Sequence, residues 1–296
     1  MKEQITDILK FKGVFPAFYA CYDHDGNVSE EKTKQYARFL ADHGAHGVYL
    51  TGSSGECVFL NKEERKLIMR AVTEEIGDEL TIIVHVGGEN TKDSMELAAY
   101  AAELQVDAVS SIPPIYYPLS KKAIKAYWKA IMDASNLPFI VYNIPQNTGI
   151  NVTTEMFREM LEDPRVIGIK NTTLPVMDIQ QYKAIGGDHC VVFNGPDEQF
   201  AAGRMMGADA GIGSTYSPMI ELYLEMDRLI NENNAVKAFE IQKFVTNTIL
   251  DILSCDGHLF SSLKTLMKYR GLDLGSARLP LPQNSEADLK RLEGIY

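Results

Sequence analysis

A lysine stands at the end of a short apolar segment near the middle of the chain. Lys170 follows Val166–Ile169, a run typical of a buried strand, and precedes Asn171, Thr172 and Thr173. Burial lowers the pKa of a lysine because the ammonium loses hydration, and a neutral amine is the nucleophile that forms a Schiff base. Lys170 is therefore a candidate nucleophile, and a strand-terminal lysine that reaches into solvent is the alternative.

A tyrosine occupies the equivalent place after another apolar segment. Tyr142 ends the run Pro138–Tyr142 and is followed by Asn143, Ile144 and Pro145. A phenol at the end of a buried strand can donate or accept a proton in a reaction. A tyrosine half-buried against the core is the alternative interpretation.

Two serines between glycines form a candidate anion-binding turn. The sequence Gly52-Ser53-Ser54-Gly55-Glu56 directly follows the apolar residues Tyr49 and Leu50. Exposed backbone N–H groups and two hydroxyls in one turn suit a carboxylate, to which such donors make short, strong hydrogen bonds. An ordinary Gly/Ser turn is the alternative.

Acidic and hydroxyl groups follow two later apolar segments. Gly195, Asp197 and Glu198 follow the first of these segments, and Gly213 and Ser214 end the second. Carboxylates repel phosphate but hydrogen-bond to sugar hydroxyls, so the pattern favours a polyhydroxylated ligand without phosphate. The alternative is that the two acidic residues only stabilise a helix N-terminus.

Eight short apolar segments carry these residues, and each reads as a buried strand of a parallel sheet. Their ranges are 13–18, 47–50, 81–86, 107–112, 138–142, 166–169, 190–194 and 210–213. Segments with helical periodicity lie between them, at 30–43, 62–76, 94–104, 121–135 and 154–161. Asn61 and Glu64 form a capping-box pattern at the start of the second of these helices.

After Tyr216 the chain is expected to be helical, with an eighth barrel helix from about residue 218 and others at 235–253, 258–269 and near 286. The alternation predicts one domain, residues 1–296, that comprises a (β/α)8 TIM barrel over 1–231 and a C-terminal helical extension, 232–296, packed on the barrel. A doubly wound open sheet is the alternative, but no G-x-G-x-x-G follows the first strand. In such barrels the active site lies at the C-terminal ends of the strands, which places the polar residues above on one face.

Composition excludes several classes of function. The 296 residues carry a formal net charge of -11 and contain no Lys/Arg-rich run, which argues against a nucleic-acid partner. No stretch approaches the ~18 consecutive apolar residues of a membrane span, and the charged start lacks a signal-peptide core. We therefore expect a cytoplasmic protein without membrane association.

Cysteine and histidine usage suggests neither disulfides nor a metal. The four cysteines are scattered without a C-x-x-C motif, as expected for reduced thiols in the cytoplasm. The six histidines form no H-E-x-x-H motif, and no Cys/His cluster occurs. No metal site is predicted.

Five motifs, taken in order, resemble one protein superfamily. They are GSSGE at 52–56, IPPIYY at 112–117, YNIP at 142–145, IGIK at 167–170 and NGPDEQF…GADAGIGSTY at 194–216. The set resembles the N-acetylneuraminate lyase and dihydrodipicolinate synthase superfamily of class I aldolases, and the match is collinear over nearly the whole chain, with LKTLMKYRGLDLGSARLPL ending at Leu281.

The resemblance implies a pyruvate-forming or pyruvate-using aldolase that needs neither metal nor organic cofactor. By this resemblance Lys170 is the Schiff-base lysine, Tyr142 transfers protons, and Ser53 and Ser54 hold the pyruvate carboxylate. Tyr116 matches a tyrosine that completes a neighbouring subunit's site in relatives, which implies a homotetramer.

Particular positions favour a sugar acid as substrate. The synthases of the superfamily carry an arginine two residues past the proline of YNIP, where this chain has Asn147. The lyases bind sugar hydroxyls through G-x-D-E and G-S-T-Y segments, which match Gly195, Asp197, Glu198, Gly213 and Ser214, and through a threonine that matches Thr172.

The resemblance thus implies retro-aldol cleavage of N-acetylneuraminate to N-acetylmannosamine and pyruvate. Pro196 stands where an aromatic residue is usual and Asn147 where an apolar one is common, so the choice of sugar acid stays open. The alternatives are another pyruvate-dependent aldolase, for a 2-oxo-3-deoxy sugar acid or for aspartate semialdehyde, and a non-catalytic barrel that binds a 2-oxo acid.

Overall fold

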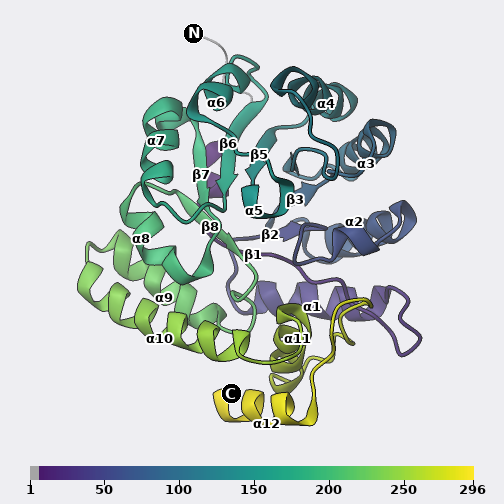
Figure 1. Ribbon diagram of the computed structural model, residues 1–296, viewed down its shortest axis with the longest axis vertical. Coiled ribbons are helices and arrows are strands. Elements are labelled where there is room, and N and C mark those ends of the chain that lie inside the picture. The colour runs from purple at the N-terminus through teal and green to yellow at the C-terminus, as the bar shows by residue number, and fades with distance from the viewer. Residues whose placement is uncertain (1–6) are drawn as a thin grey trace.

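Eight parallel strands form the centre of the computed structural model, which describes residues 7–296 (Figure 1). Residues 1–6, part of the charged start noted above, lie outside the described residues. The strands are β1 (Gly13–Pro16), β2 (Gly47–Leu50), β3 (Thr81–His85), β4 (Ala108–Ser111), β5 (Phe139–Asn143), β6 (Val166–Asn171), β7 (Val191–Asn194) and β8 (Ala210–Gly213). Their order in the sheet follows the chain, except that β1 pairs with β8.

The sheet closes on itself through β1 and β2. Ala17, just past β1, pairs with Tyr49 of β2, and the N–H of Phe18 donates to the carbonyl of Tyr49 at 2.9 Å. At the start of the same strands the N–H of His46 donates to Val14 at 3.1 Å. The predicted TIM barrel is therefore confirmed, and the open-sheet alternative is wrong.

Helices surround the strands (Figure 1). The α-helices are α1 (Glu30–Asp42), α2 (Lys62–Ile76), α3 (Thr91–Glu103), α4 (Lys121–Ser135), α5 (Pro145–Thr148), α6 (Thr154–Met160), α7 (Met177–Gly186), α8 (Phe200–Met205), α9 (Ile220–Asn231), α10 (Ala235–Leu253), α11 (Leu259–Tyr269) and α12 (Glu286–Ile295). Short 3-10 helices are η1 (Ile8–Phe11), η2 (Cys57–Phe59), η3 (Gly187–His189) and η4 (Asp197–Gln199).

Capping residues explain where two of the helices begin. Asn61 and Glu64 form the predicted capping box of α2, each side chain accepting from the other's backbone N–H at 2.9 Å. Helix α3 begins three residues earlier than expected because the side chain of Asn90 accepts from the N–H of Asp93 at 2.8 Å. Both caps satisfy donors that a helix N-terminus leaves without an internal partner.

The core has two layers, as a barrel surrounded by helices requires. Phe15, Ile83, Ile140 and Phe193 point into the barrel interior and are fully buried there. The larger layer lies between the strands and the helices. Because the interior is filled by apolar side chains, a polar group is accessible only at an end of the barrel.

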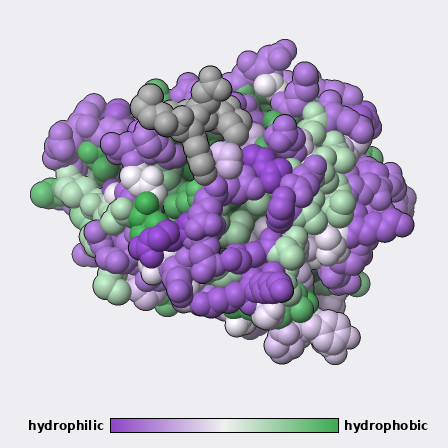
Figure 2. Space-filling model, turned by 90° about the horizontal axis from the view of Figure 1, so that it is seen from above, coloured by the Kyte–Doolittle hydropathy of each residue, from purple (hydrophilic) through white to green (hydrophobic). Residues whose placement is uncertain are grey.

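The last three helices lie outside the barrel, on the side of α1 and α9 (Figure 1). The predicted helical C-terminal end is thus present, as α10 to α12. None of the helices within residues 7–296 is long and apolar enough to cross a membrane. The face shown in Figure 2 is largely hydrophilic, with hydrophobic residues in small groups.

Candidate active site

Lys170 and Tyr142 are neighbours at the C-terminal ends of two adjacent strands. Strands β5 and β6 pair in parallel with Tyr142 directly opposite Lys170. Lys170 is only 5% exposed, and its Nζ lies 4.1 Å from the centroid of the Tyr142 ring. Strand β6 runs to Asn171, two residues beyond the predicted end, so Lys170 lies within the strand and its backbone is fixed by pairing. An amine and a phenol are therefore held together in a largely dry site.

A second tyrosine completes the surroundings of the amine. Tyr49 of β2 places its ring centroid 4.6 Å from Lys170 Nζ and packs edge-on against Tyr142, with the centroids 5.9 Å apart. Its hydroxyl donates to Ser110 Oγ at 3.0 Å, so its orientation is fixed. The sequence patterns did not single out Tyr49, because it reads as one more apolar residue of a buried strand.

His85, at the end of β3, is another buried residue of the site that the sequence patterns did not identify. Its ring lies perpendicular to that of Tyr142, with the centroids 6.1 Å apart. Its Nδ1 lies 3.0 Å from the Thr51 carbonyl, and its Nε2 accepts from the N–H of Ile112 at 3.3 Å. These partners define the neutral tautomer with its proton on Nδ1.

Burial and a nearby arginine keep this histidine neutral. Desolvation and the positive charge of Arg65 lower the pKa of His85 to about 3. Arg65 is itself buried and donates to the carbonyls of His85 and Gly87 at 2.6 and 2.8 Å. His85 therefore serves here as a fixed hydrogen-bond donor and not as a proton carrier at neutral pH.

The Gly52–Glu56 turn follows β2 with donors free for an anion. Ser54 is buried and Ser53 half-buried, and within residues 7–296 the N–H groups of both lack a protein acceptor. A Cβ on Gly52 would lie 2.6 Å from the ring of Tyr49, which in turn contacts Lys170. The turn thus packs directly on the wall of the lysine site, and its free donors suit a carboxylate.

The carboxylate of Asp197 accepts hydrogen bonds from the loop after β8. Its Oδ2 accepts from the N–H and the hydroxyl of Thr215 at 2.7 and 2.8 Å, and from the Ser214 hydroxyl at 3.3 Å. Burial raises the pKa of Asp197 to about 7, although the Thr215 hydrogen bonds and the charge of Lys170 oppose the rise. The predicted Asp197 and Ser214, one from each of these two loops, are therefore in direct contact, and Asp197 lies within the electrostatic influence of Lys170.

Two glycines of this region are required by close approach. A Cβ on Gly213 would lie 2.1 Å from Asp197 Oδ1, and one on Gly195 would lie 2.1 Å from Thr172 Oγ1. The Thr172 hydroxyl oxygen is buried and, in the described part of the chain, has no hydrogen-bond partner. A buried hydroxyl without a partner is a donor or acceptor available to a ligand.

Four other residues singled out from the sequence differ from one another in how far they are exposed. Glu198 is exposed in η4 beside Asp197, Pro196 is buried, and Asn147 is exposed in α5. Tyr116 is 89% exposed with φ 80°, and its ring contacts that of Tyr117, with the centroids 5.0 Å apart. A single chain therefore does not bring Tyr116 into the lysine site.

Buried asparagines hold the strand ends in place. The Asn143 amide donates to Asn171 Oδ1 at 2.9 Å, and Asn171 donates to Thr173 Oγ1 at 2.8 Å. Asn143 also accepts from the N–H of Val152 at 3.0 Å. Each asparagine directly follows a site residue, Tyr142 or Lys170, so this chain of hydrogen bonds fixes the backbone that carries both.

No group of three or more His, Cys, Asp or Glu side chains within residues 7–296 is arranged to hold a metal ion. The four cysteines have free thiols.

The chain is similar in sequence to proteins of one enzyme family. The model of the dihydrodipicolinate synthetase family matches residues 10–295. An N-acetylneuraminate lyase of Mediterraneibacter gnavus is 45% identical over 288 residues, 97% of this chain and 91% of that protein. N-acetylneuraminate lyase 2 of Escherichia coli O6:H1 is 36% identical over 89% of this chain and 86% of its own length.

Solved structures agree with these relatives. Wild-type sialic acid aldolase of Ruminococcus gnavus superposes with a TM-score of 0.95 at 44% identity, covering 97% of this chain and 96% of that one. A catalytic lysine mutant of the same organism's aldolase gives a TM-score of 0.97 at 43% identity, covering 98% and 96%. The chain therefore belongs to the dihydrodipicolinate synthetase family.

Proposed function

We propose that this chain is a carbon–carbon lyase that cleaves N-acetylneuraminate to N-acetylmannosamine and pyruvate through a Schiff base on Lys170. The observation that carries the proposal is the pairing of Lys170 with Tyr142, whose ring centroid lies 4.1 Å from the amine. A nucleophile beside a proton-transfer group is what a class I aldolase needs. The similarity to N-acetylneuraminate lyases over nearly the whole chain supports the choice of substrate.

The carboxylate of the substrate binds the turn after β2. The N–H and hydroxyl groups of Ser53 and Ser54 hold it, and the contact of this turn with Tyr49 directs the adjacent carbonyl carbon toward Lys170. Fixing the substrate in this way makes the attack effectively intramolecular.

Bond cleavage follows from the chemistry of the imine. The Lys170 amine attacks the C2 carbonyl of the open-chain sugar acid, and loss of water gives the imine. The protonated imine then accepts the electron pair of the C3–C4 bond as this bond breaks, which forms an enamine. Tyr142 accepts the proton of the C4 hydroxyl as it passes its own phenol proton to the substrate's carboxylate, so that the sugar leaves as an aldehyde. The enamine takes a proton at C3, and hydrolysis frees pyruvate and the amine.

The sugar portion binds the loops after β6, β7 and β8. Asp197, Ser214 and the free Thr172 hydroxyl supply donors and acceptors for its hydroxyls, with Glu198 at the exposed end. Gly195 and Gly213 leave room for these contacts. Pro196 and Asn147 are the positions at which a preference among sugar acids is decided.

Pyruvate release from N-acetylneuraminate and from 2-oxo-3-deoxygluconate tests the proposal, with pyruvate consumption in the presence of aspartate semialdehyde assayed in parallel to detect the synthase reaction. Release from the sialic acid alone supports it, and release only from another acid assigns the substrate elsewhere in the family. Borohydride reduction in the presence of pyruvate is expected to modify Lys170 covalently. If Lys170→Ala keeps more than a trace of lyase activity, the imine mechanism is wrong.

We also propose a cytoplasmic homotetramer in which Tyr116 reaches the site of a neighbouring subunit. The assembly is supported by the 89% exposure of Tyr116, on a loop next to Tyr117, which is 71% exposed. The cytoplasmic location is supported by the four free thiols. Sedimentation equilibrium is expected to give four times the chain mass, and a Tyr116→Ser variant is expected to show a raised KM. A monomer with full activity would contradict the assembly.

A further inference from the structure

Two residues in left-handed conformation bracket the proposed carboxylate-binding turn. Thr51 has φ 50° and Glu56 has φ 54°, and neither is glycine. Side chains with a Cβ disfavour this region, and residues stay in it only when surrounding contacts hold them there. The groups that hold Thr51 and Glu56 therefore determine the shape of the turn between them.

Buried polar contacts hold Glu56 from the C-terminal extension. The Nζ of Lys264, in α11, donates to Glu56 Oε1 at 2.6 Å, and the N–H of Arg278 donates to Glu56 Oε2 at 2.7 Å. Both side chains of the ion pair are almost fully buried. In a buried pair each charge depends on the other, since neither can be hydrated.

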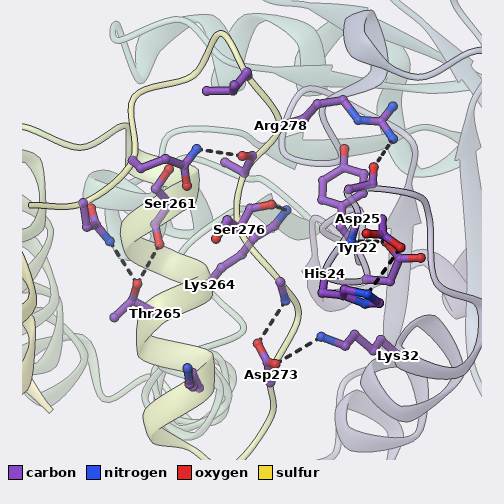
Figure 3. Close-up of a pocket in the computed structure, with 18 of the residues that line it drawn as sticks. Tyr22, His24, Asp25, Lys32, Ser261, Lys264, Thr265, Asp273, Ser276 and Arg278 are labelled. Atoms are coloured by element: carbon purple, nitrogen blue, oxygen red, sulfur yellow. Dashed lines mark hydrogen bonds and ion pairs between the residues drawn. The ribbon is translucent and has the colours of Figure 1, made fainter.

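The cation is itself fixed on its remaining sides. Lys264 Nζ donates to the Ser276 carbonyl at 3.3 Å and lies 4.3 Å from the centroid of the Tyr22 ring. Figure 3 shows Lys264 reaching from α11 toward the segment that carries Ser276. Arg278 donates to the Phe59 carbonyl at 2.7 Å, so the extension contacts both ends of η2, at its N-cap Glu56 and its last residue Phe59.

An open cavity lies next to the buried ion pair of Glu56 and Lys264. It has a volume of about 980 Å³ and is lined by Tyr22, Lys264, Arg278 and other residues of the first loop and the extension (Figure 3). Lys268, one turn further along α11, lines the same cavity but is exposed. If the amine of Lys264 is removed, Glu56 can turn toward this open space, and the turn before it loses its left-handed end.

We propose that Lys264 is a positioning residue, which fixes Glu56 and thereby holds the donors of Ser53 and Ser54 where the carboxylate of the 2-oxo acid binds. This inference rests on the proposed function, since it assumes that this turn binds the carboxylate. It assigns to the C-terminal extension a part in substrate binding, although none of the site residues described above belongs to the extension.

Borohydride trapping on Lys170 at increasing ketone concentration tests the inference. The ketones are pyruvate and hydroxyacetone, which has no carboxylate, and the variants are Lys264→Met and Glu56→Gln/Lys264→Met. The double variant removes both buried charges and keeps the test available if the single one fails to fold. Lys268→Met is the matched control, because it removes a lysine from the same helix and cavity.

We expect the half-saturating pyruvate concentration to rise roughly tenfold or more in both variants, because misplaced donors bind the carboxylate weakly. For hydroxyacetone we expect a change within about twofold, and Lys268→Met is expected to behave as wild type. Unchanged half-saturation for pyruvate, or equal losses for both ketones, would overturn the positioning role. If the wild-type protein traps no pyruvate, the proposed function itself fails. This outcome is read from the wild-type protein and does not depend on the variants.

Discussion

Thr51 and His85 exchange two hydrogen bonds across the ends of strands β2 and β3. The Thr51 hydroxyl donates to the His85 carbonyl at 2.7 Å, and His85 Nδ1 donates to the Thr51 carbonyl at 3.0 Å. Thr51 is the left-handed residue before the Gly52–Glu56 turn, and the His85 ring packs on Tyr142. One buried histidine thus connects the turn with Tyr142, for which proton transfer is proposed.

His85→Asn should weaken the pH dependence of stability. The pKa of His85 is lowered to about 3, so below its ordinary value near 6.5 only the unfolded chain takes up the proton. This contribution to stability is full above pH ~6.5 and is lost as the pH falls toward 3. Between pH 7 and 4.5 the variant should lose about 2 to 3 kcal/mol less than wild type, in urea unfolding at one protein concentration.

The exposed His24 provides the control for this measurement. Its side chain is 90% exposed, so His24→Asn should keep the wild-type acid dependence. An equal loss of stability in His85→Asn and wild type over the same pH range would show that the histidine is not held neutral by the fold.

Tyr142→Phe should separate imine formation from bond cleavage. The substitution keeps the ring beside Lys170 and removes only the hydroxyl, so borohydride trapping of pyruvate is expected to persist. The kcat for N-acetylneuraminate should fall about 10²- to 10⁴-fold, as expected when a proton-transfer group is lost.

Tyr49→Phe is the matched comparison, since its ring also lies beside the amine but its hydroxyl is bound to Ser110. Its kcat should fall by less than about tenfold. Equal losses in the two tyrosine variants would remove Tyr142 from its proposed role.

Asp197→Asn should affect the sugar and not the pyruvate portion of the site. The carboxylate accepts from Ser214 and Thr215, and an amide cannot reproduce all of these hydrogen bonds. The KM for N-acetylneuraminate is expected to rise roughly tenfold or more, with half-saturation of pyruvate trapping unchanged. Parallel changes in both constants would place Asp197 outside the sugar subsite.

The same variant should change the way stability varies between acidic and neutral pH. The pKa of Asp197 is raised to about 7, so the folded chain keeps a proton that the unfolded chain releases near pH 4. The resulting stability is full below pH ~4 and is lost as the pH rises through 7. Between pH 5 and 8, wild type should lose about 2 to 3 kcal/mol relative to Asp197→Asn, as measured by urea unfolding. Parallel stability curves would contradict the raised pKa.

Local patterns predicted most of the barrel. All eight strands were expected close to their observed positions, because buried parallel strands read as short apolar runs. Helices α7 and α8 were not assigned ranges from the sequence, and α5 was not expected. The α7 face buries only Ile179 and Tyr182, and α5 is a single turn after Pro145, so neither offers a long periodic signal.

The site was predictable only where its residues end a strand. Lys170 and Tyr142 stand at the ends of the expected segments, whereas Tyr49 lies inside one. His85 lies inside the expected segment 81–86, although β3 itself ends at His85. The contact of Glu56 with Lys264 joins residues 208 positions apart, and no local spacing records such a contact. The contact exists only because the extension packs against the barrel.

A double-mutant cycle on Glu56 and Lys264 should reveal strong coupling in stability. Lys264→Met leaves the buried Glu56 carboxylate without its cation and should lower the free energy of unfolding by about 3 to 5 kcal/mol. Glu56→Gln/Lys264→Met removes both charges, so it should be more stable than Lys264→Met alone. Lys268→Met, on the exposed side of α11, should change stability by less than about 0.5 kcal/mol. The cycle compares Lys264→Met and Glu56→Gln, each alone, with the double variant in urea unfolding. If the effects of the two single substitutions add to that of the double variant within about 0.5 kcal/mol, the two residues act independently, and the extension does not hold the turn through this pair.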